Sequence, residues 1–428
     1  MLTTLYTAVS GMNANGTSLS VIGDNIANQN TVGFKASTVA FGDVLSQTLA
    51  GVSGSAQVGR GVLVSSVNPQ FTQGSFETTS SALDMAIDGD GFFIVNENGA
   101  NYYTRAGQFS LDKDGNIVNP DGLVLQGFQA DATGNITGTL GDLKMATTQS
   151  VASATSSATV AVNLDATAQV PGAAFTLGTP PTTPANYNFS NTISVFDSQG
   201  GAHDVTLYYV KTADNAWTVH YVHDDPANPG QLVEAGTQDL TFGKDGSLTD
   251  DNSGTAINFD FGGSVTSPQA ITFNYGTGTG ETPAGTGLDS TTQFASSSAV
   301  INLTQDGYSA GSLKNVSISQ DGRITGVFTN GQTRTIGQVA LAKFVAPTAL
   351  TKLGKNLYAQ TYDSGQPLVG AAGTSGLGSI VSNSLELSNV DLAQEFVNMI
   401  SAQRGFEANS RIITTTDELM QEVVNLKR

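Results

Sequence analysis

Histidine is the residue type to consider first for catalysis or metal binding, because the chain contains three histidines and no cysteine. His220 and His223 stand three residues apart, and Asp224 and Asp225 follow them, which is the pattern nearest to a metal site. The residues at 217–222 read as a strand, in which side chains three positions apart point to opposite faces. One metal ion cannot easily bind both imidazole rings. We therefore interpret them as ordinary histidines at a strand end and predict no metal site.

Glycine-rich motifs give a second set of candidate sites. Asp88–Gly91 (DGDG) and Asp112–Gly115 (DKDG) resemble calcium loops, but both lack the acidic spacing and the closing Glu that such loops need. Asp-Gly pairs of this kind are better explained as tight turns between strands. The run Gly276–Gly280 (GTGTG) has neither a P-loop lysine nor a following helix, so it predicts a flexible linker rather than a phosphate site.

The sequence also gives no set of residues for nucleophilic catalysis. A catalytic serine needs a histidine and an acid that orients the ring. His203, His220 and His223 all fall in one stretch, and no serine or carboxylate pair is singled out beside them. The sequence therefore predicts a protein that is not an enzyme and has no cofactor, with no catalytic, cofactor-binding or metal-binding residue.

The strongest pattern is an apolar stripe at each end of the chain, whose members alternate steps of three and four residues. Such steps average about 3.5 residues and hold a seam on one face of a supercoiling helix. We predict one helix from about residue 3 to 28 and another from about 389 to 426, with Ser388 as N-cap and Asp391 three residues on. The residues predicted to mediate self-assembly are Leu5, Val9, Met12, Leu19, Ile26, Phe396, Met399, Phe406, Ile413, Met420 and Val423.

These stripes are compatible with core helices of one domain, with a dimeric coiled coil, or with packing of many helices. The seam positions include small and polar residues, namely Gly16, Gly23, Ala402, Asn409 and Thr416. Such residues bury little apolar area, so an isolated dimer would gain little stability. We therefore favour higher-order packing.

The middle of the chain is rich in strand signals, such as the apolar run Phe92–Val95 between turn residues. Residues 28–70 predict an irregular connector, in which short alternating pieces such as Val62, Val64 and Val67 suggest extended chain. Residues 146–190, rich in Ala, Ser, Thr and Pro, predict a boundary. The predicted fold is mainly β with terminal α-helices, nested and multidomain, in which the helices pair as a coiled-coil-like layer. The predicted parts are a terminal helical assembly domain (1–28 and 388–428), a connector (29–70 and 371–387), an inner β domain (71–145 and 299–370) and an inserted outer β domain (146–298).

Composition excludes several kinds of partner and chemistry. The net charge of -19 argues against nucleic acid, because that affinity comes largely from Lys and Arg. The absence of cysteine rules out disulfides and thiolate sites. No stretch of about 18 apolar residues exists, so we expect no membrane insertion. The N-terminus has no Lys or Arg before Lys35, and we therefore expect no cleaved secretory signal.

Several motifs resemble the bacterial flagellar rod and hook family. The Asn-rich run ANQNTVGFK at 27–35 is similar to that family's N-terminal signature, and SNVDLAQEFVNMISAQRGFEANSR, from 388, is similar to its terminal signature. Between them, DGDGFFIV from 88, YTRAGQF from 103 and DGNIVN from 114 resemble the next block. The residues that carry the first motif are Ala27, Asn28, Thr31, Gly33, Phe34 and Lys35.

The resemblance implies a structural subunit of the flagellum. Length and the inserted block at 146–298, which contains FDSQGGAHDVTLYYVKT, favour a hook subunit, and a distal-rod subunit of the basal body is the alternative. A hook subunit would self-assemble into a curved tube that transmits motor torque from rod to filament. The implied partners are copies of the chain, the distal rod protein, the hook cap, the hook–filament junction protein and the type III export apparatus. The implied location is the extracellular hook and basal body, reached without signal cleavage.

Overall fold

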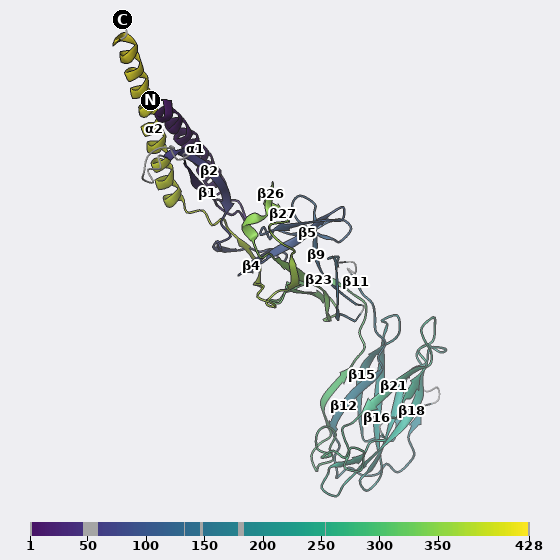
Figure 1. Ribbon diagram of the computed structural model, residues 1–428. Coiled ribbons are helices and arrows are strands. Elements are labelled where there is room, and N and C mark those ends of the chain that lie inside the picture. The colour runs from purple at the N-terminus through teal and green to yellow at the C-terminus, as the bar shows by residue number, and fades with distance from the viewer. Residues whose placement is uncertain are drawn as a thin grey trace. The chain divides into compact units, whose positions relative to one another are not determined.

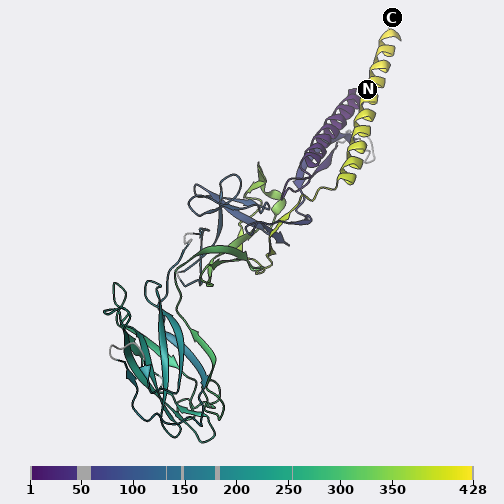
Figure 2. The same ribbon diagram turned by 180° about the vertical axis from the view of Figure 1, so that it is seen from behind.

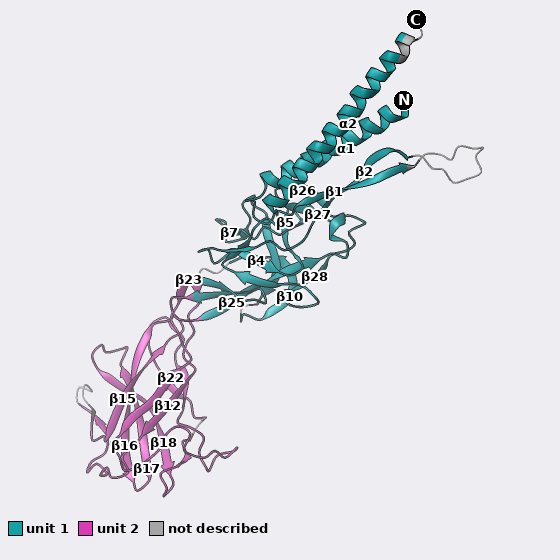
Figure 3. Ribbon diagram, turned by 90° about the vertical axis from the view of Figure 1, so that its left-hand side faces the viewer, with its two compact units in different colours: residues 1–147, 314–327, 333–428 teal, residues 148–313, 328–332 magenta. Residues whose placement is uncertain are grey.

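The computed structural model describes residues 2–45, 59–131, 133–145, 149–178, 184–252 and 254–426. Within these ranges the chain is mainly β with one helix at each end, and the two helices pack together, which confirms the predicted fold class. The chain forms two compact units (Figure 3). Unit 1 comprises residues 1–147, 314–327 and 333–428, and unit 2 comprises residues 148–313 and 328–332.

The terminal helices of unit 1 are α1 (Leu2–Ala27) and α2 (Leu392–Leu426). They lie side by side and run antiparallel, so that the start of α1 lies along the middle of α2 (Figure 1, Figure 2). Neither has the length and apolar character that a membrane span requires.

The start of α2 differs from the prediction. Asp391 caps the helix, because its Oδ1 accepts the backbone N–H groups of Ala393 at 2.9 Å and Gln394 at 3.2 Å. Ser388 instead accepts the N–H of Val390 at 3.3 Å, in the turn before the helix. The prediction of Ser388 as N-cap is therefore wrong. Asp at this position satisfies the first free donors and also places negative charge at the helix N-terminus.

A hairpin occupies part of the segment predicted as an irregular connector. β1 (Ser37–Leu45) pairs antiparallel with β2 (Gly59–Pro69), and both strands pack along α1. The N–H of Val62 donates to Oγ of Ser10 at 3.2 Å. A Cβ at Gly61 would lie 2.2 Å from that oxygen, so only glycine fits there. The extended chain expected at Val62, Val64 and Val67 is confirmed by β2, whereas the prediction of irregular chain is wrong for β1. Pairing of the two strands and their contacts with α1 stabilise both of them.

The rest of unit 1 is a β domain built around one large sheet. Strands β9, β5 and β6 lie in its centre, β25 pairs with β9 and β5, and aromatic side chains such as Phe92, Tyr103 and Phe344 meet edge to face in the core. Two short pairs, β4 with β29 and β3 with β30, join the N- and C-terminal parts of the unit. The strands are β3 (Phe76–Thr78), β4 (Met85–Asp88), β5 (Phe92–Glu97), β6 (Ala100–Thr104), β7 (Ser110–Leu111), β8 (Ile117–Val118), β9 (Val124–Ala130), β10 (Ile136–Asp142), β24 (Arg323–Phe328), β25 (Thr333–Lys343), β26 (Thr351–Gly354), β27 (Leu357–Ala359), β28 (Leu368–Ala371), β29 (Ser379–Ser382) and β30 (Ser384–Glu386), with a 3-10 turn at Pro347–Ala349.

Unit 2 is a β-sandwich. A five-stranded antiparallel sheet (order β15-β16-β17-β18-β19) and a four-stranded sheet (order β20-β21-β12-β22) share one core, in which Trp217, Tyr221 and Phe273 are fully buried. The strands are β11 (Gln149–Ser150), β12 (Ser157–Asn163), β13 (Thr176–Leu177), β14 (Pro184–Ala185), β15 (Phe189–Phe196), β16 (Ala202–Ala213), β17 (Ala216–Asp224), β18 (Leu232–Phe242), β19 (Leu248–Asp250), β20 (Ile257–Phe259), β21 (Gln269–Asn274) and β22 (Ala299–Gln305), and β23 (Gly311–Ile318) leads back into unit 1.

The stretch predicted as a boundary contributes an inner strand to this sandwich. β12 pairs parallel with β21 and antiparallel with β22, and its Val160 and Val162 are fully buried. The Ala, Ser and Thr content suggested a linker, but alternating small and β-branched residues also suit a strand between two neighbours. Both partner strands, β21 and β22, lie more than a hundred residues further along the chain. A local sequence pattern therefore cannot show this pairing.

Candidate assembly interface

The helix pair is held by two matching glycine–asparagine contacts. A Cβ at Gly11 would lie 2.8 Å from the amide atoms of Asn409, and a Cβ at Gly405 would lie 3.0 Å from Oδ1 of Asn15. Each asparagine also donates its Nδ2 to the glycine carbonyl four residues before it in its own helix, at 2.9 Å in both cases. The same Gly-x-x-Ala-Asn pattern, at 11–15 and 405–409, therefore builds both halves of an antiparallel contact.

Most residues predicted to mediate self-assembly flank this seam instead of forming it. The half-buried members are Leu5, Val9, Met12, Leu19, Ile26, Met399, Ile413 and Met420, the exposed members are Phe396 and Phe406, and the side chain of Val423 lies outside the described part. The buried positions of α1 are Ala8, Gly11, Ala14, Ile22 and Asn25, mostly one position before the predicted stripe. The buried face of α1 therefore differs from the predicted apolar stripe, because small residues allow the two helix backbones to approach more closely than larger apolar residues do. The role of the predicted residues between copies stays a prediction.

Apolar side chains of α2 remain exposed in the single chain. Among the helix side chains that the structure describes, seven large apolar ones are exposed, and six of them belong to α2: Tyr6 on α1, and Phe396, Val397, Ile400, Phe406, Ile412 and Leu419 on α2. We call the six residues of α2 the outer apolar residues. A run of this kind on a helix whose seam is already satisfied is typical of a surface that another molecule covers.

The Asn-rich motif after α1 forms a turn that fixes the exit of the chain. Asn28 donates its Nδ2 to the carbonyl of Asp24 at 3.0 Å, and Thr31 donates its hydroxyl to Oδ1 of Asn28 at 3.1 Å. Gly33 has a φ of 69°, and a Cβ there would lie 2.5 Å from the backbone nitrogen of Ala106, so no other residue fits. Ala27 is exposed at the end of the helix.

Phe34 and Lys35 complete the motif and are both buried. Lys35 pairs with Glu386 of β30 at 2.6 Å, and Arg105 approaches the other oxygen of Glu386 at 3.4 Å. Burial lowers the pKa of Lys35 and of Arg105, and the charge of Glu386 opposes that shift in both. Phe34 lies beneath the ammonium of Lys352, 5.4 Å from the ring centre. The triad thus ties the segments next to both helices to the β domain.

A second polar cluster joins the base of α1 to the start of α2. Asn25 donates its Nδ2 to the carbonyl of Ser37 at 2.9 Å and to Oε1 of Glu395 at 3.2 Å, while the N–H of Ser37 donates to Oδ1 of Asn25 at 2.9 Å. Asn389 accepts the N–H of Ala36 at 2.8 Å. These contacts set where β1 leaves the helix pair.

His220 and His223 of unit 2 contact different groups. His220 pairs with Glu234 at 2.7 Å, whereas His223 is buried against Phe259 and Phe261, and burial lowers the pKa of His223. The two rings therefore have separate surroundings.

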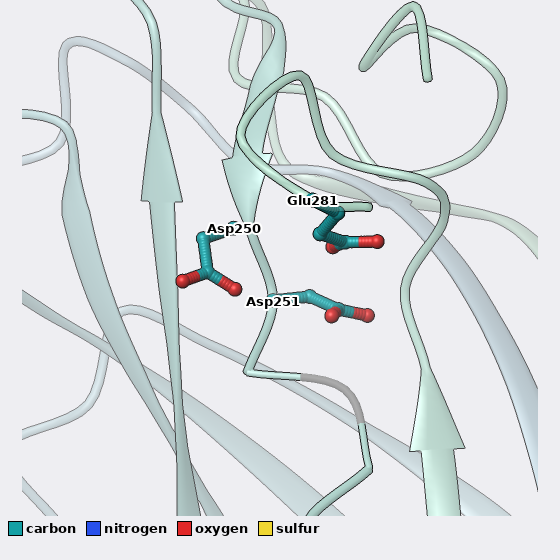
Figure 4. Close-up of side chains that lie close together, drawn as sticks. All are labelled: Asp250, Asp251 and Glu281. Atoms are coloured by element: carbon teal, nitrogen blue, oxygen red, sulfur yellow. The ribbon is translucent and has the colours of Figure 1, made fainter. Parts of the chain in front are cut away.

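Three carboxylates that the sequence did not single out converge elsewhere in unit 2, at Asp250, Asp251 and Glu281 (Figure 4). The N–H of Tyr275 donates to Asp251 at 2.9 Å, and burial, together with the nearby charge of Asp251, raises the pKa of Glu281.

Sequence reasoning missed most of the interface. The triad of Lys35, Arg105 and Glu386 joins positions up to 351 residues apart, which no local pattern shows. The sequence does contain a pattern that indicates the glycine–asparagine contacts, namely the repeated Gly-x-x-Ala-Asn. A search for apolar residues does not detect this pattern.

Four family descriptions match the chain. They are "Flagella basal body rod protein" over residues 5–35, "Flagellar hook protein FlgE/F/G D1 domain" over 86–169, "Flagellar basal body protein FlaE D2 domain" over 163–308, and "Flagellar basal body rod FlgEFG protein C-terminal" over 381–426. The fold, the helix pair and these matches define a protein of the flagellar rod and hook class.

Full-length relatives narrow the class. The chain is 36% identical to the flagellar hook protein FlgE of Escherichia coli, over 98% of this chain and 99% of that protein. It is also 36% identical to the flagellar hook protein FlgE of Borreliella burgdorferi, over 100% of both. The crystal structure of Helicobacter pylori flagellar hook protein FlgE2 has a similar fold, with a TM-score of 0.50 and 14% identity over 71% of this chain and 98% of that one. The chain belongs to the flagellar hook protein family.

Proposed function

We propose that this chain is the structural subunit of the bacterial flagellar hook and polymerises into a curved tube that transmits torque from the rod to the filament. The observation that carries the proposal is the exposure of the outer apolar residues on a helix whose inner seam is already packed. Neighbouring copies cover such a surface, and contacts that do not close into a ring generate a helical tube. The full-length similarity to proteins named as hook proteins supports this function over the distal-rod alternative.

The subunit has a mechanical role and needs neither catalysis nor a cofactor. Its proposed partners are copies of itself, the distal rod protein, the hook cap, the hook–filament junction protein and the flagellar export apparatus. We assign assembly to residues 1–28 and 388–428, and bending to movement of the β domains at 71–145 with 299–370 and at 146–298. The proposed location is the extracellular hook, reached by export without signal cleavage.

Expression of the chain in a bacterium whose own hook gene is deleted tests this function. We expect curved hooks on the cell surface and restored motility. A matched variant that ends at residue 391, and so lacks α2, should restore neither. Cells that carry only straight rods, or that swim equally well with the shortened chain, would contradict the proposal.

A further inference from the structure

An open cavity lies between the two helices and the hairpin of unit 1. Its volume is about 280 Å³, and its walls come from α1 (Ser18 and Ile22), β1 (Val39 and Phe41) and α2 (Glu395 and Ala402). All of these residues belong to the described ranges. The lining is mixed, with apolar side chains from Val39 and Phe41, neutral polar side chains such as Ser18 and Asn398, and Glu395 as its acidic member. This combination suits a ligand with an apolar stem and a positive, hydrogen-bonding end.

Glu395 is the unusual member of this cavity. Only 8% of its surface is exposed, and its Oε1 accepts from Nδ2 of Asn25 at 3.2 Å. Its other oxygen, Oε2, is buried without a hydrogen-bond partner among the described residues. A buried carboxyl oxygen without a donor is costly. Because Glu395 lines the cavity, a small rotation of its carboxyl would present this oxygen to a donor that enters there. Lys352, a cation of the same chain, instead donates its Nζ to Oγ of Ser37 at 2.7 Å.

A suitable donor stands on the opposite face of α2. Arg404 and Arg411 are exposed and form no ion pair within the described part of the chain. Arg404 comes two residues after the buried Ala402, so it points away from α1 and cannot turn back into the cavity of its own chain. It can meet Glu395 only in another copy.

We propose that the cavity binds the side chain of Arg404 from a second copy of this chain, with its guanidinium donating to Oε2 of Glu395. This inference rests on the proposed polymerisation through the terminal helices. Arginine fits because its planar fork pairs with carboxylates and its stem packs on apolar walls, here Val39 and the half-exposed ring of Phe41.

Arg404 fits this role better than Arg411. Ile400 and Val397, four and seven residues before Arg404, are exposed on the same stripe and would cover the apolar mouth of the cavity. Glu407 lies four residues before Arg411, the order that favours pairing within one helix, but three residues after Arg404, the less favourable order. Arg404 is therefore the freer of the two to pair with another copy.

A double-mutant cycle on the full chain tests the contact. The critical concentration for polymerisation is measured for Glu395→Gln, Arg404→Gln and the double variant, with Glu418→Gln as the matched control at an exposed position of α2. We expect each single change to raise the critical concentration about tenfold and the double change to raise it no further, because both remove one contact. The control should leave it unchanged.

Independent, multiplying effects of the two changes would overturn the proposal, and so would coupling of Glu395 with Arg411→Gln instead. Normal polymerisation of both single variants would overturn it while leaving the proposed function intact. Failure of the unaltered chain to form tubes would overturn both.

A cross-link gives a second measurement that does not depend on stability. The chain has no cysteine, so Val39→Cys with Arg404→Cys places one thiol at the cavity and one on the opposite face of α2. A thiol-reactive cross-linker about as long as an arginine side chain should give a ladder of covalent multimers in assembled tubes, since a direct disulfide would need Cα atoms within about 7 Å. Each single cysteine variant serves as control. Tubes that form without a ladder would contradict the contact.

Discussion

Replacing Gly11 by alanine tests the helix seam. Two effects oppose each other, because alanine favours a helix over glycine by about 1 kcal/mol, whereas overpacking a tight contact costs about 1–3 kcal/mol. The added Cβ would lie 2.8 Å from Asn409, and moving that side chain also disturbs its bond to the carbonyl of Gly405, worth about 1 kcal/mol. We therefore expect Gly11→Ala to be destabilising by about 1–3 kcal/mol in sum.

Gly16 provides the matched control, because no atom lies within 4 Å of a Cβ added there. Gly16→Ala should gain the helix preference alone and be stabilising by about 1 kcal/mol. The assay is urea-induced loss of helix in assembled tubes, followed by far-ultraviolet circular dichroism for both variants and the unaltered chain. Equal stabilisation by the two alanines would refute the seam described above.

Further predictions concern both units. Glu386→Gln leaves Lys35 and Arg105 buried without a full counter-charge, so it should lower the stability of unit 1 by about 3–5 kcal/mol in urea unfolding; a loss below 1 kcal/mol would contradict the triad. The fold raises the pKa of Glu281 above its ordinary value of 4.5. Glu281 therefore contributes stability at and below pH 4.5, and this contribution is lost as the pH rises through the raised pKa. The urea midpoint reported by Trp217, the single tryptophan, should therefore fall less with rising pH in Glu281→Gln than in the unaltered chain, and parallel curves would contradict this. In limited proteolysis of the monomer, both terminal helices should be cut before the β domains, whereas assembled tubes should resist; equal resistance in the monomer would argue against ordering on assembly.

The sequence predicted the kinds of element better than their contacts. Strand signals around Phe92 and at Trp217 were correct because both patterns are local: β5 buries a continuous apolar run, and the first part of β17 alternates between buried and half-buried residues. The helices were also found, since a stripe with steps of three and four is a local pattern. Within the single chain, the buried positions of α1 are small residues such as Ala8 and Gly11, because close packing of helices favours them, whereas Leu5 and Met12 are half-buried. The role of Leu5 and Met12 between copies stays a prediction.

The parts that could not be predicted depend on distant partners. β12 reads as a linker until β21 and β22 are placed beside it. Glu386 and Glu395 look like ordinary surface acids in the sequence, and only the fold buries them. The functional class followed from motif resemblance, but the cavity beside Glu395 required the structure.

The most direct test of the central claim is a three-dimensional image of tubes assembled from the purified chain, at a resolution that separates helices from sheets. Our account predicts a curved tube whose inner wall consists of α1 and α2 from successive copies, with the outer apolar residues covered by neighbouring copies. A straight tube, or an inner wall built from the β domains with α2 exposed to solvent, would contradict it.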